Sequence, residues 1–103
     1  MVQSVNEPCY DLKLYVAGHS PRSLLAIDNF ETLCRGCLKG RCTAEVIDIL
    51  QDPKMAGSAQ VVATPTLVKH SPGKLGRLVG TLSETDKVLA ALDLKPNREE
   101  KSN

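Results

Sequence analysis

The sequence contains no tryptophan and only three other aromatic residues, Tyr10, Tyr15 and Phe30. That is too few for a platform on which nucleic-acid bases stack. The sequence also has no excess of either charge, because its thirteen Lys and Arg nearly balance its twelve Asp and Glu, for a net charge of +1. A dedicated nucleic-acid binder needs a basic surface, so both shortages argue against that class of partner.

Long apolar runs are absent as well. No stretch approaches the roughly 20 apolar residues that span a bilayer. The segment before Asp11 has neither a basic region nor an apolar region, so it does not resemble a secretory signal. We therefore expect a cytoplasmic protein with no membrane span, whose four cysteines stay reduced.

The 103 residues suit one compact domain. We expect this domain over residues 11–94, with a flexible N-terminus (1–10) and a flexible polar tail (95–103). A domain of this size buries only about two thirds of its unfolded surface, so self-association into a dimer or tetramer would add stability.

The first half of the chain predicts a βαβ unit. Alternation and β-favouring residues indicate a strand over 12–17. Ser20 and Pro21 then form a helix-start signature, and Gly36 ends the helix. Apolar residues recur at helical spacing on its expected core face: Leu24, Ile27, Phe30, Leu33 and Cys34. The run 45–50 predicts a second strand, parallel to the first and apolar enough to lie inside a sheet.

The second half predicts a short helix, two strands and a last helix. Asp52 and Pro53 open a helix through Ala59, and strands over 66–70 and 76–80 follow. Ser83 with Asp86 reads as a capping box that starts a helix through about Leu94. The predicted order is βαβαββα, an α/β fold. With Thr64-Pro65 just before the third strand, it resembles the thioredoxin layout, in which that proline is cis.

A redox enzyme of this layout needs Cys-x-x-Cys at the start of the first helix, where the helix dipole and free amides lower the pKa of the thiol. The four residues there, 20–23, are Ser-Pro-Arg-Ser. Phosphate-binding glycine loops and His-Glu-x-x-His runs are also missing from the sequence. We therefore expect a protein that is not an enzyme and needs no cofactor.

One cysteine group keeps an alternative open. Cys34 and Cys37 form a Cys-x-x-Cys pair at the end of the first helix, and Cys42 follows five residues later. The pair could serve as half of a metal site. The alternative function is a thiol redox or metal-binding regulator, and the simpler interpretation is one core thiol and two loop thiols, with no metal.

Several stretches in order resemble the KaiB circadian-clock proteins, from about Asp11 to Leu94. They are Leu12-Lys-Leu-Tyr-Val-Ala-Gly18 with Ser20-Pro21, Val46-Ile-Asp-Ile-Leu50 with Asp52-Pro53, Ala63-Thr-Pro-Thr-Leu67, Val79-Gly80-x-Leu82-Ser83, and Lys87-Val-Leu89 through Leu92-Asp-Leu94. The resemblance implies a regulator that binds the KaiC ATPase ring, sequesters KaiA and displaces the kinase SasA. It also implies two folds: a resting oligomer of order βαββααβ and the thioredoxin-like binding form.

The resemblance also implies which residues carry the function. Partner binding would fall around Glu45, Leu50, Asp52 and Lys54. The change of fold would involve Pro65, Pro72, Ala91 and Asp93. Short apolar runs, such as 61–63 and 78–79, favour neither helix nor strand, and two packings a few kcal/mol apart allow a fold switch. Pro65 and Pro72 are candidate slow steps, because uncatalysed isomerisation takes on the order of tens of seconds to minutes.

Two residues depart from the family pattern. Ala91 stands where the clock proteins have glycine, and alanine favours a helix over glycine by roughly 1 kcal/mol. Glu45 stands where they usually have lysine, and a reversed rim charge alters partner choice. We therefore expect a divergent paralogue with its own KaiC-like partner, in clock output or stress signalling.

Overall fold

The computed structural model describes residues 9–39, 41–59 and 63–95. The elements follow the predicted order: β1 (Tyr10–Val16), α1 (Pro21–Arg35), β2 (Cys42–Asp48), α2 (Pro53–Ala59), β3 (Thr66–Ser71), β4 (Gly76–Val79) and α3 (Thr85–Ala91). The βαβαββα prediction is confirmed. In the part of the chain that is described, no helix has the length and apolar character needed to cross a membrane.

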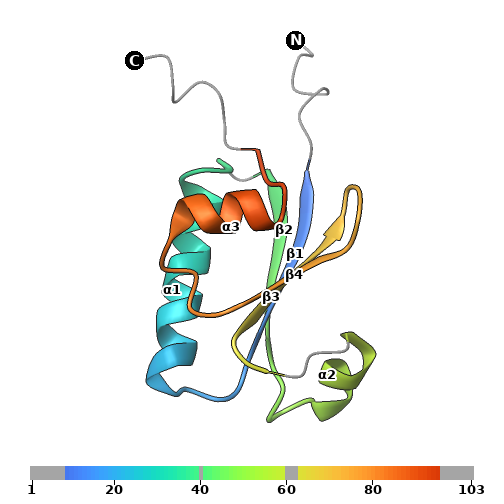
Figure 1. The fold of residues 1–103 in the computed structure, drawn as a ribbon. Helices are drawn as coiled ribbons and strands as arrows, with labels where there is room; N and C mark the ends of the chain where they lie inside the picture. The colour runs from blue at the N-terminus through green and yellow to red at the C-terminus, as the bar shows by residue number, and fades with distance from the viewer. Residues whose placement is uncertain (1–8, 40, 60–62, 96–103) are drawn as a thin grey trace.

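The four strands form one sheet in the order β2-β1-β3-β4. β1 runs parallel to β2 and antiparallel to β3, and β3 pairs antiparallel with β4. Helices α1 and α3 cover one face of the sheet, whereas α2 lies on the other (Figure 1). The bonds Thr64–Pro65 and Ser71–Pro72 are both cis, which agrees for Pro65 with what the thioredoxin resemblance implied.

The core has two parts because successive side chains of a strand point to opposite faces. The larger part lies between the sheet and helices α1 and α3: Tyr10, Leu12, Leu14, Val16, Ala26, Phe30, Leu33, Cys34, Leu38, Leu67, Leu82, Val88, Leu92 and Leu94. The smaller part, on the α2 side, consists of Tyr15, Ile47 and Val68, with Ile49 and Met55 packed against it. The short apolar run 61–63 cannot be followed in full, because residues 61 and 62 lie outside the described residues.

Helix α1 follows its predicted signals. The Ser20 side chain accepts a hydrogen bond from the Ser23 N–H (3.2 Å), Pro21 opens the helix, and the Gly36 N–H donates to the Thr32 carbonyl (2.8 Å). The predicted core face needs one correction, because Leu24 is half exposed. Ser23 and Ala26 are buried instead, and the Ser23 hydroxyl bonds the backbone of Ala17, just after β1.

Strand β2 was predicted to lie inside the sheet, and that prediction is wrong. β2 is an edge strand, and it begins at Cys42 and ends at Asp48. Ile49 and Leu50, expected in the strand, form the turn that follows. Of the apolar residues in this run, Ile47 is buried, whereas Val46 and Leu50 are exposed.

The last helix is shorter than predicted, and its cap is not the predicted one. α3 begins at Thr85, and the Ser83 hydroxyl lies 2.8 Å from the Thr81 hydroxyl and does not cap the helix. After Ala91 the Leu94 N–H bonds to the Leu89 carbonyl (2.8 Å) and the Asp93 N–H to the Ala90 carbonyl (3.3 Å), with Asp93 at φ 54°. This is a Schellman motif with Asp93 in its left-handed position.

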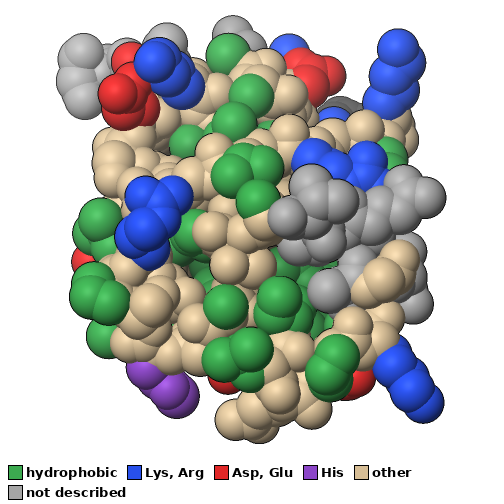
Figure 2. All heavy atoms as spheres, turned by 60° about the horizontal axis from the view of Figure 1, so that its bottom comes forward, with side chains coloured by type: hydrophobic (Ala, Val, Ile, Leu, Met, Phe, Trp, Pro, Cys, Tyr) green, Lys and Arg blue, Asp and Glu red, His purple; other side chains and the backbone are tan. Residues whose placement is uncertain are grey.

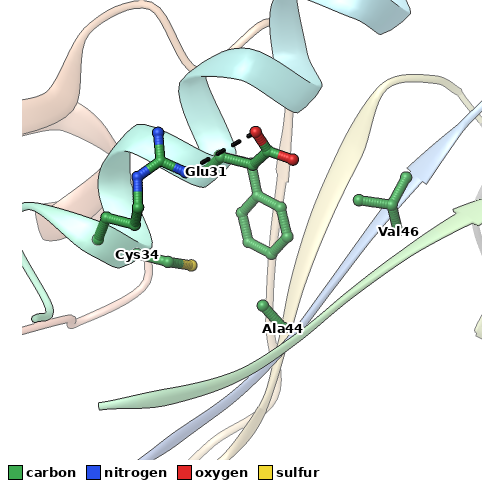
Figure 3. A pocket seen from close by; sticks show the side chains of 6 residues that line it. Glu31, Cys34, Ala44 and Val46 are labelled. Atoms are coloured by element: carbon green, nitrogen blue, oxygen red, sulfur yellow. Dashed lines mark ion pairs between the residues drawn. The ribbon is translucent and has the colours of Figure 1, made fainter. Parts of the chain in front are cut away.

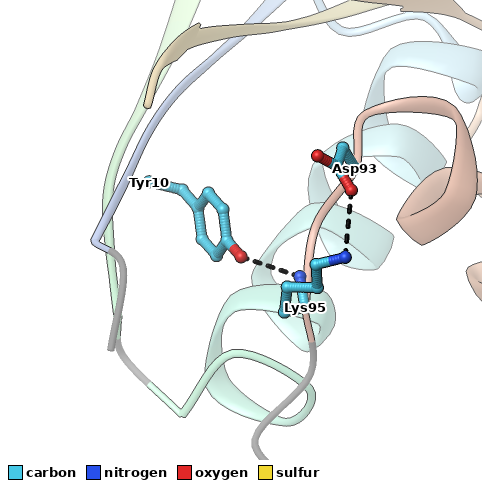
Figure 4. Close-up of polar contacts among 3 residues, drawn as sticks. All are labelled: Tyr10, Asp93 and Lys95. Carbon is cyan, nitrogen blue, oxygen red and sulfur yellow. Dashed lines mark hydrogen bonds and ion pairs between the residues drawn. The ribbon is translucent and has the colours of Figure 1, made fainter. Parts of the chain in front are cut away.

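The two ends of the described chain meet at β1. The Lys95 N–H donates to the Tyr10 hydroxyl (2.8 Å), and the Arg41 guanidinium donates to the Lys95 carbonyl (2.8 Å). Figure 4 shows Lys95 between Tyr10 and Asp93, with which its ammonium is ion-paired (3.2 Å). Tyr10 and Lys95 had been assigned to flexible ends. Tyr10 is instead a buried residue of β1, and the rest of both segments lies outside the described residues except the exposed Cys9.

The Tyr10 hydrogen bond makes a stability prediction. Tyr10→Phe keeps the buried ring but leaves the Lys95 N–H without this acceptor. We expect the free energy of unfolding in urea to fall by about 1 kcal/mol, the net value of one hydrogen bond. Tyr15→Phe is the matched control, because Tyr15 is equally buried. Equal losses in the two variants would show that the contact between the chain ends contributes nothing.

Candidate functional site

The start of α1 is where a thioredoxin-like redox enzyme would carry its thiol pair. Here Ser23 is buried, and its hydroxyl donates to the Ala17 carbonyl and accepts from the Ala17 N–H (both 3.3 Å). Ser20 also bonds Ser23 (3.0 Å). Both serines are therefore engaged in holding the strand-to-helix turn together, and neither side chain can perform thiol–disulfide exchange.

β2 forms one edge of the sheet, and β4 forms the other. Residues 43–46 are all exposed, and among the described residues β2 has a strand neighbour on one side only. Ala44 and Val46 face the α1 side, while Glu45 shares the opposite face with Ile47. An unpaired strand edge presents free backbone N–H and C=O groups to a partner.

The turn after β2 is fixed by one carboxylate. Asp48 accepts hydrogen bonds from the Gly18 N–H (2.9 Å) and the Leu50 N–H (3.0 Å), so it ties the end of β2 to the end of β1. These backbone bonds, the one from Gly18 first, lower the pKa of Asp48 below its ordinary value of 3.8. Gly18 has a positive φ of 65°, and a Cβ there would lie 3.1 Å from Leu50 Cδ1. Asp48 and Gly18 together hold Leu50 on the surface.

The four residues predicted to bind a partner lie in sequence along this region. Glu45 is on β2, Leu50 is in the turn, Asp52 precedes α2 and Lys54 is in its first turn, and all four are exposed. Leu50 is the most exposed large apolar residue of the described chain, at 68%. We call Glu45, Leu50, Asp52 and Lys54 the β2–α2 surface. The structure makes them accessible, and their role in binding stays a prediction.

Sequence reasoning missed five further exposed apolar residues of the described chain: Leu24, Leu25, Val46, Leu75 and Val79. Figure 2 views the end of the molecule that contains the β2–α2 turn, and hydrophobic side chains gather there with charged ones mainly toward the margins. No local signal could have found them, because Leu24 fits the helical core period and Val46 stands in an apolar run. Their exposure depends on which neighbours the elements acquire.

A groove of about 270 Å³ runs between α1 and the edge strand. Phe30, Cys34, Ala44 and Val46 line it, and Glu31 and Arg35 form an exposed ion pair (3.9 Å) at its rim (Figure 3). The groove extends the exposed edge of β2 with an apolar surface on the α1 side.

The cysteines that had left an alternative open are free thiols. Cys34 is buried at the groove and lies near Cys42, which is the first residue of β2 and not a loop residue. Burial first, and then the Cys42 contact, raises the pKa of Cys34, so little of the nucleophilic thiolate forms at neutral pH. Within the described ranges, no three His, Cys, Asp or Glu residues group as a metal site.

Sequence comparison identifies relatives. The family model described as the KaiB domain matches residues 13–94. The chain is 41% identical over 85 residues to circadian clock protein KaiB3 of a Synechocystis strain, covering 82% of this chain and 83% of that protein. It is 42% identical over 85 residues to circadian clock oscillator protein KaiB of Prochlorococcus marinus, covering 82% and 79%. The segment matched by the family model contains all the sequence motifs except Leu12.

Solved structures agree on the fold. Mitochondrial thioredoxin 3 of Saccharomyces cerevisiae is similar with a TM-score of 0.68 at 19% identity, covering 87% of this chain and 83% of that one. The N-terminal domain of SasA from Synechococcus elongatus is similar with a TM-score of 0.66 at 22% identity, covering 88% and 89%. At such identities the likeness concerns the fold alone, and the predicted thioredoxin-like class is confirmed.

The depressed pKa of Asp48 makes stability depend on pH. Its carboxylate stabilises the fold fully above its unfolded pKa, and that contribution disappears as the pH falls through the lower folded pKa. We expect Asp48→Asn to unfold at lower urea concentration than the wild type at pH 7, and the gap to close below pH 3.8. Asp28→Asn, at an exposed position of α1, is the control. A gap that is constant with pH would contradict the assignment.

Proposed function

The chain belongs to the KaiB family of circadian clock proteins, and we propose that it is a regulatory binding protein, not an enzyme, whose partner is a KaiC-like hexameric ATPase. It acts in the cytoplasm and modulates clock or related stress-signalling output. Two departures from the family pattern, Glu45 and Ala91, make it a divergent paralogue with its own ATPase.

The observation that carries this proposal is the β2–α2 surface. It joins a free strand edge, an exposed leucine and two exposed charged residues on a turn that Asp48 holds in place. A preorganised turn costs less entropy to bind than a mobile one. The start of α1, by contrast, offers two hydrogen-bonded serines where a redox enzyme needs a thiol.

The similarity to the SasA N-terminal domain supports a competitive mode of action. Two domains with the same fold can present equivalent edges and turns to one binding site. In this proposal the chain displaces a SasA-like kinase from the ATPase, and the bound chain can then recruit a KaiA-like protein.

The described fold is the binding form in this proposal, and a resting dimer or tetramer of order βαββααβ is the other. The end of α3 helps to decide between them. Ala91 is its last helical residue, and Asp93 takes the left-handed position of the Schellman motif. Both residues therefore act on a helix end that exists in the thioredoxin-like form.

Substitutions on the β2–α2 surface test the partner. We expect Leu50→Ser to weaken binding to a hexameric KaiC-like ATPase with nucleotide by about tenfold, since one buried leucine contact contributes roughly 1.5 kcal/mol or more. Glu45→Lys should change the association rate and its salt dependence more than the affinity. Biolayer interferometry measures both quantities.

Lys87→Ala is the matched control, because Lys87 is exposed on α3. It should bind like the wild type. If all three variants bind like the wild type, the β2–α2 surface is not the docking site. If the unmodified chain binds no such ATPase, the proposed function itself is wrong.

Ala91 tests the fold switch. Ala91→Gly removes only an exposed methyl group but weakens the helix by up to about 1 kcal/mol. We expect the fraction of the thioredoxin-like form, measured from two sets of amide peaks by NMR, to fall by up to about fivefold relative to the resting form. A wild-type chain found almost wholly in the resting form would contradict the role given to Ala91.

A further inference from the structure

Strand β3 carries a lysine in an unusual place. Lys69 is only 4% exposed, and it follows Leu67 on the same face of the strand, toward the larger core. It pairs with Leu12 in β1 and with Gly76 in β4, so it lies inside the sheet, not at an edge. Such a position normally holds an apolar residue, because a buried charge is costly unless it is paired.

Lys69 lines a pocket of about 280 Å³ between the β3–β4 turn and the end of α3. Lys74 and Leu75 come from the turn, Gly76 from β4, and Leu92 and Asp93 from the end of the helix. Gly76 lets the Leu92 side chain pack closely against β4, because a Cβ at this position would lie only 2.9 Å from Leu92 Cδ2. The site is thus built from β3, the β3–β4 turn with the start of β4, and the end of α3.

The charges of the pocket are unbalanced. Within the described part of the chain, no ion pair or hydrogen bond of the Lys69 ammonium is seen, and its nitrogen is not among the fully buried polar atoms that lack a partner, so the ammonium reaches the solvent of the pocket. Asp93 also lines the pocket, but its carboxylate pairs with Lys95 (3.2 Å). Lys74 adds a second positive charge. The carbonyl end of α3 compensates a cation only in part, since a helix dipole contributes a fraction of a charge.

From this arrangement we propose that the pocket binds a carboxylate carried on a short aliphatic chain. The carboxylate pairs with Lys69 and Lys74, and the aliphatic part packs between Leu75 and Leu92. The group could belong to a small free acid or to an acidic side chain of a partner protein. Lys69 pairs with Leu12, near the start of β1, whereas the β2–α2 turn adjoins its end. The site is therefore independent of the β2–α2 surface.

Binding at this pocket would also stabilise the thioredoxin-like form. A ligand that binds only when α3 and the β3–β4 hairpin are in place stabilises the thioredoxin-like form by mass action. Thermal unfolding then reports binding without any need for the ATPase, so a negative result here leaves the proposed function untouched.

Glutarate is the probe for the free acid, and a Gly-Ser peptide with a single central Glu is the probe for a partner side chain. We expect glutarate to shift the amide NMR signals of Lys69, Lys74, Gly76 and Leu92, and to raise the melting temperature. Whichever probe binds more tightly identifies the source. Inorganic phosphate should bind more weakly, because it gains nothing from the two leucines.

Lys69→Met should weaken glutarate binding by about tenfold, the loss of one hydrogen bond to a charged group. Lys54→Met, on the β2–α2 surface, is the matched control and should bind glutarate like the wild type. If Lys69→Met does not fold, Lys74→Gln gives the test, with an expected weakening of about threefold.

Three outcomes would overturn the proposal. The first is that neither probe shifts the pocket signals at a millimolar concentration. The second is that shifts spread evenly over exposed lysines such as Lys54 and Lys87, which indicates screening and not a site. The third is a folded Lys69→Met or Lys74→Gln variant that binds glutarate as tightly as the wild type.

Discussion

The pairing of β1 with β2 on one side and β3 on the other is the constraint on which the rest of the structure depends. β1 alternates its side chains between the two parts of the core, with Leu12 and Leu14 wholly buried on one face and Tyr15 on the other. A shift of one residue would exchange these faces, so the register is strongly specified. With β3 on the inner side, β2 keeps a free outer edge.

That arrangement separates two surfaces along the sheet. At the end of β1 the Asp48 carboxylate joins Gly18 to the turn after β2, which leaves Leu50 exposed. At the start of β1, Tyr10 holds Lys95 just after the end of α3. The surface proposed for docking therefore lies at one end of β1, and the charged pocket lies at the other.

Local signals predicted the elements well, whereas features set by distant contacts escaped them. Ser20 and Pro21 mark the start of α1 and Gly36 marks its end, as predicted, because each signal involves only residues within about one helical turn. The apolar run 45–50 suits an inner strand as well as an edge strand. β2 is an edge strand because β3 pairs with the other side of β1. Ser83 matched a capping pattern, yet it bonds Thr81. The exposed residues of the β2–α2 surface could be named from the family resemblance, but nothing in the sequence marked Lys69 as buried.

Amide hydrogen exchange of the chain, free and bound to a hexameric KaiC-like ATPase, tests the central claim most directly. The claim is that the thioredoxin-like form docks through the edge of β2 and the turn after it. It predicts that amides over residues 43–54 exchange more slowly in the complex, while those of β4 are unchanged. Protection confined to β4 and α3, or no protection at 43–54, would contradict it.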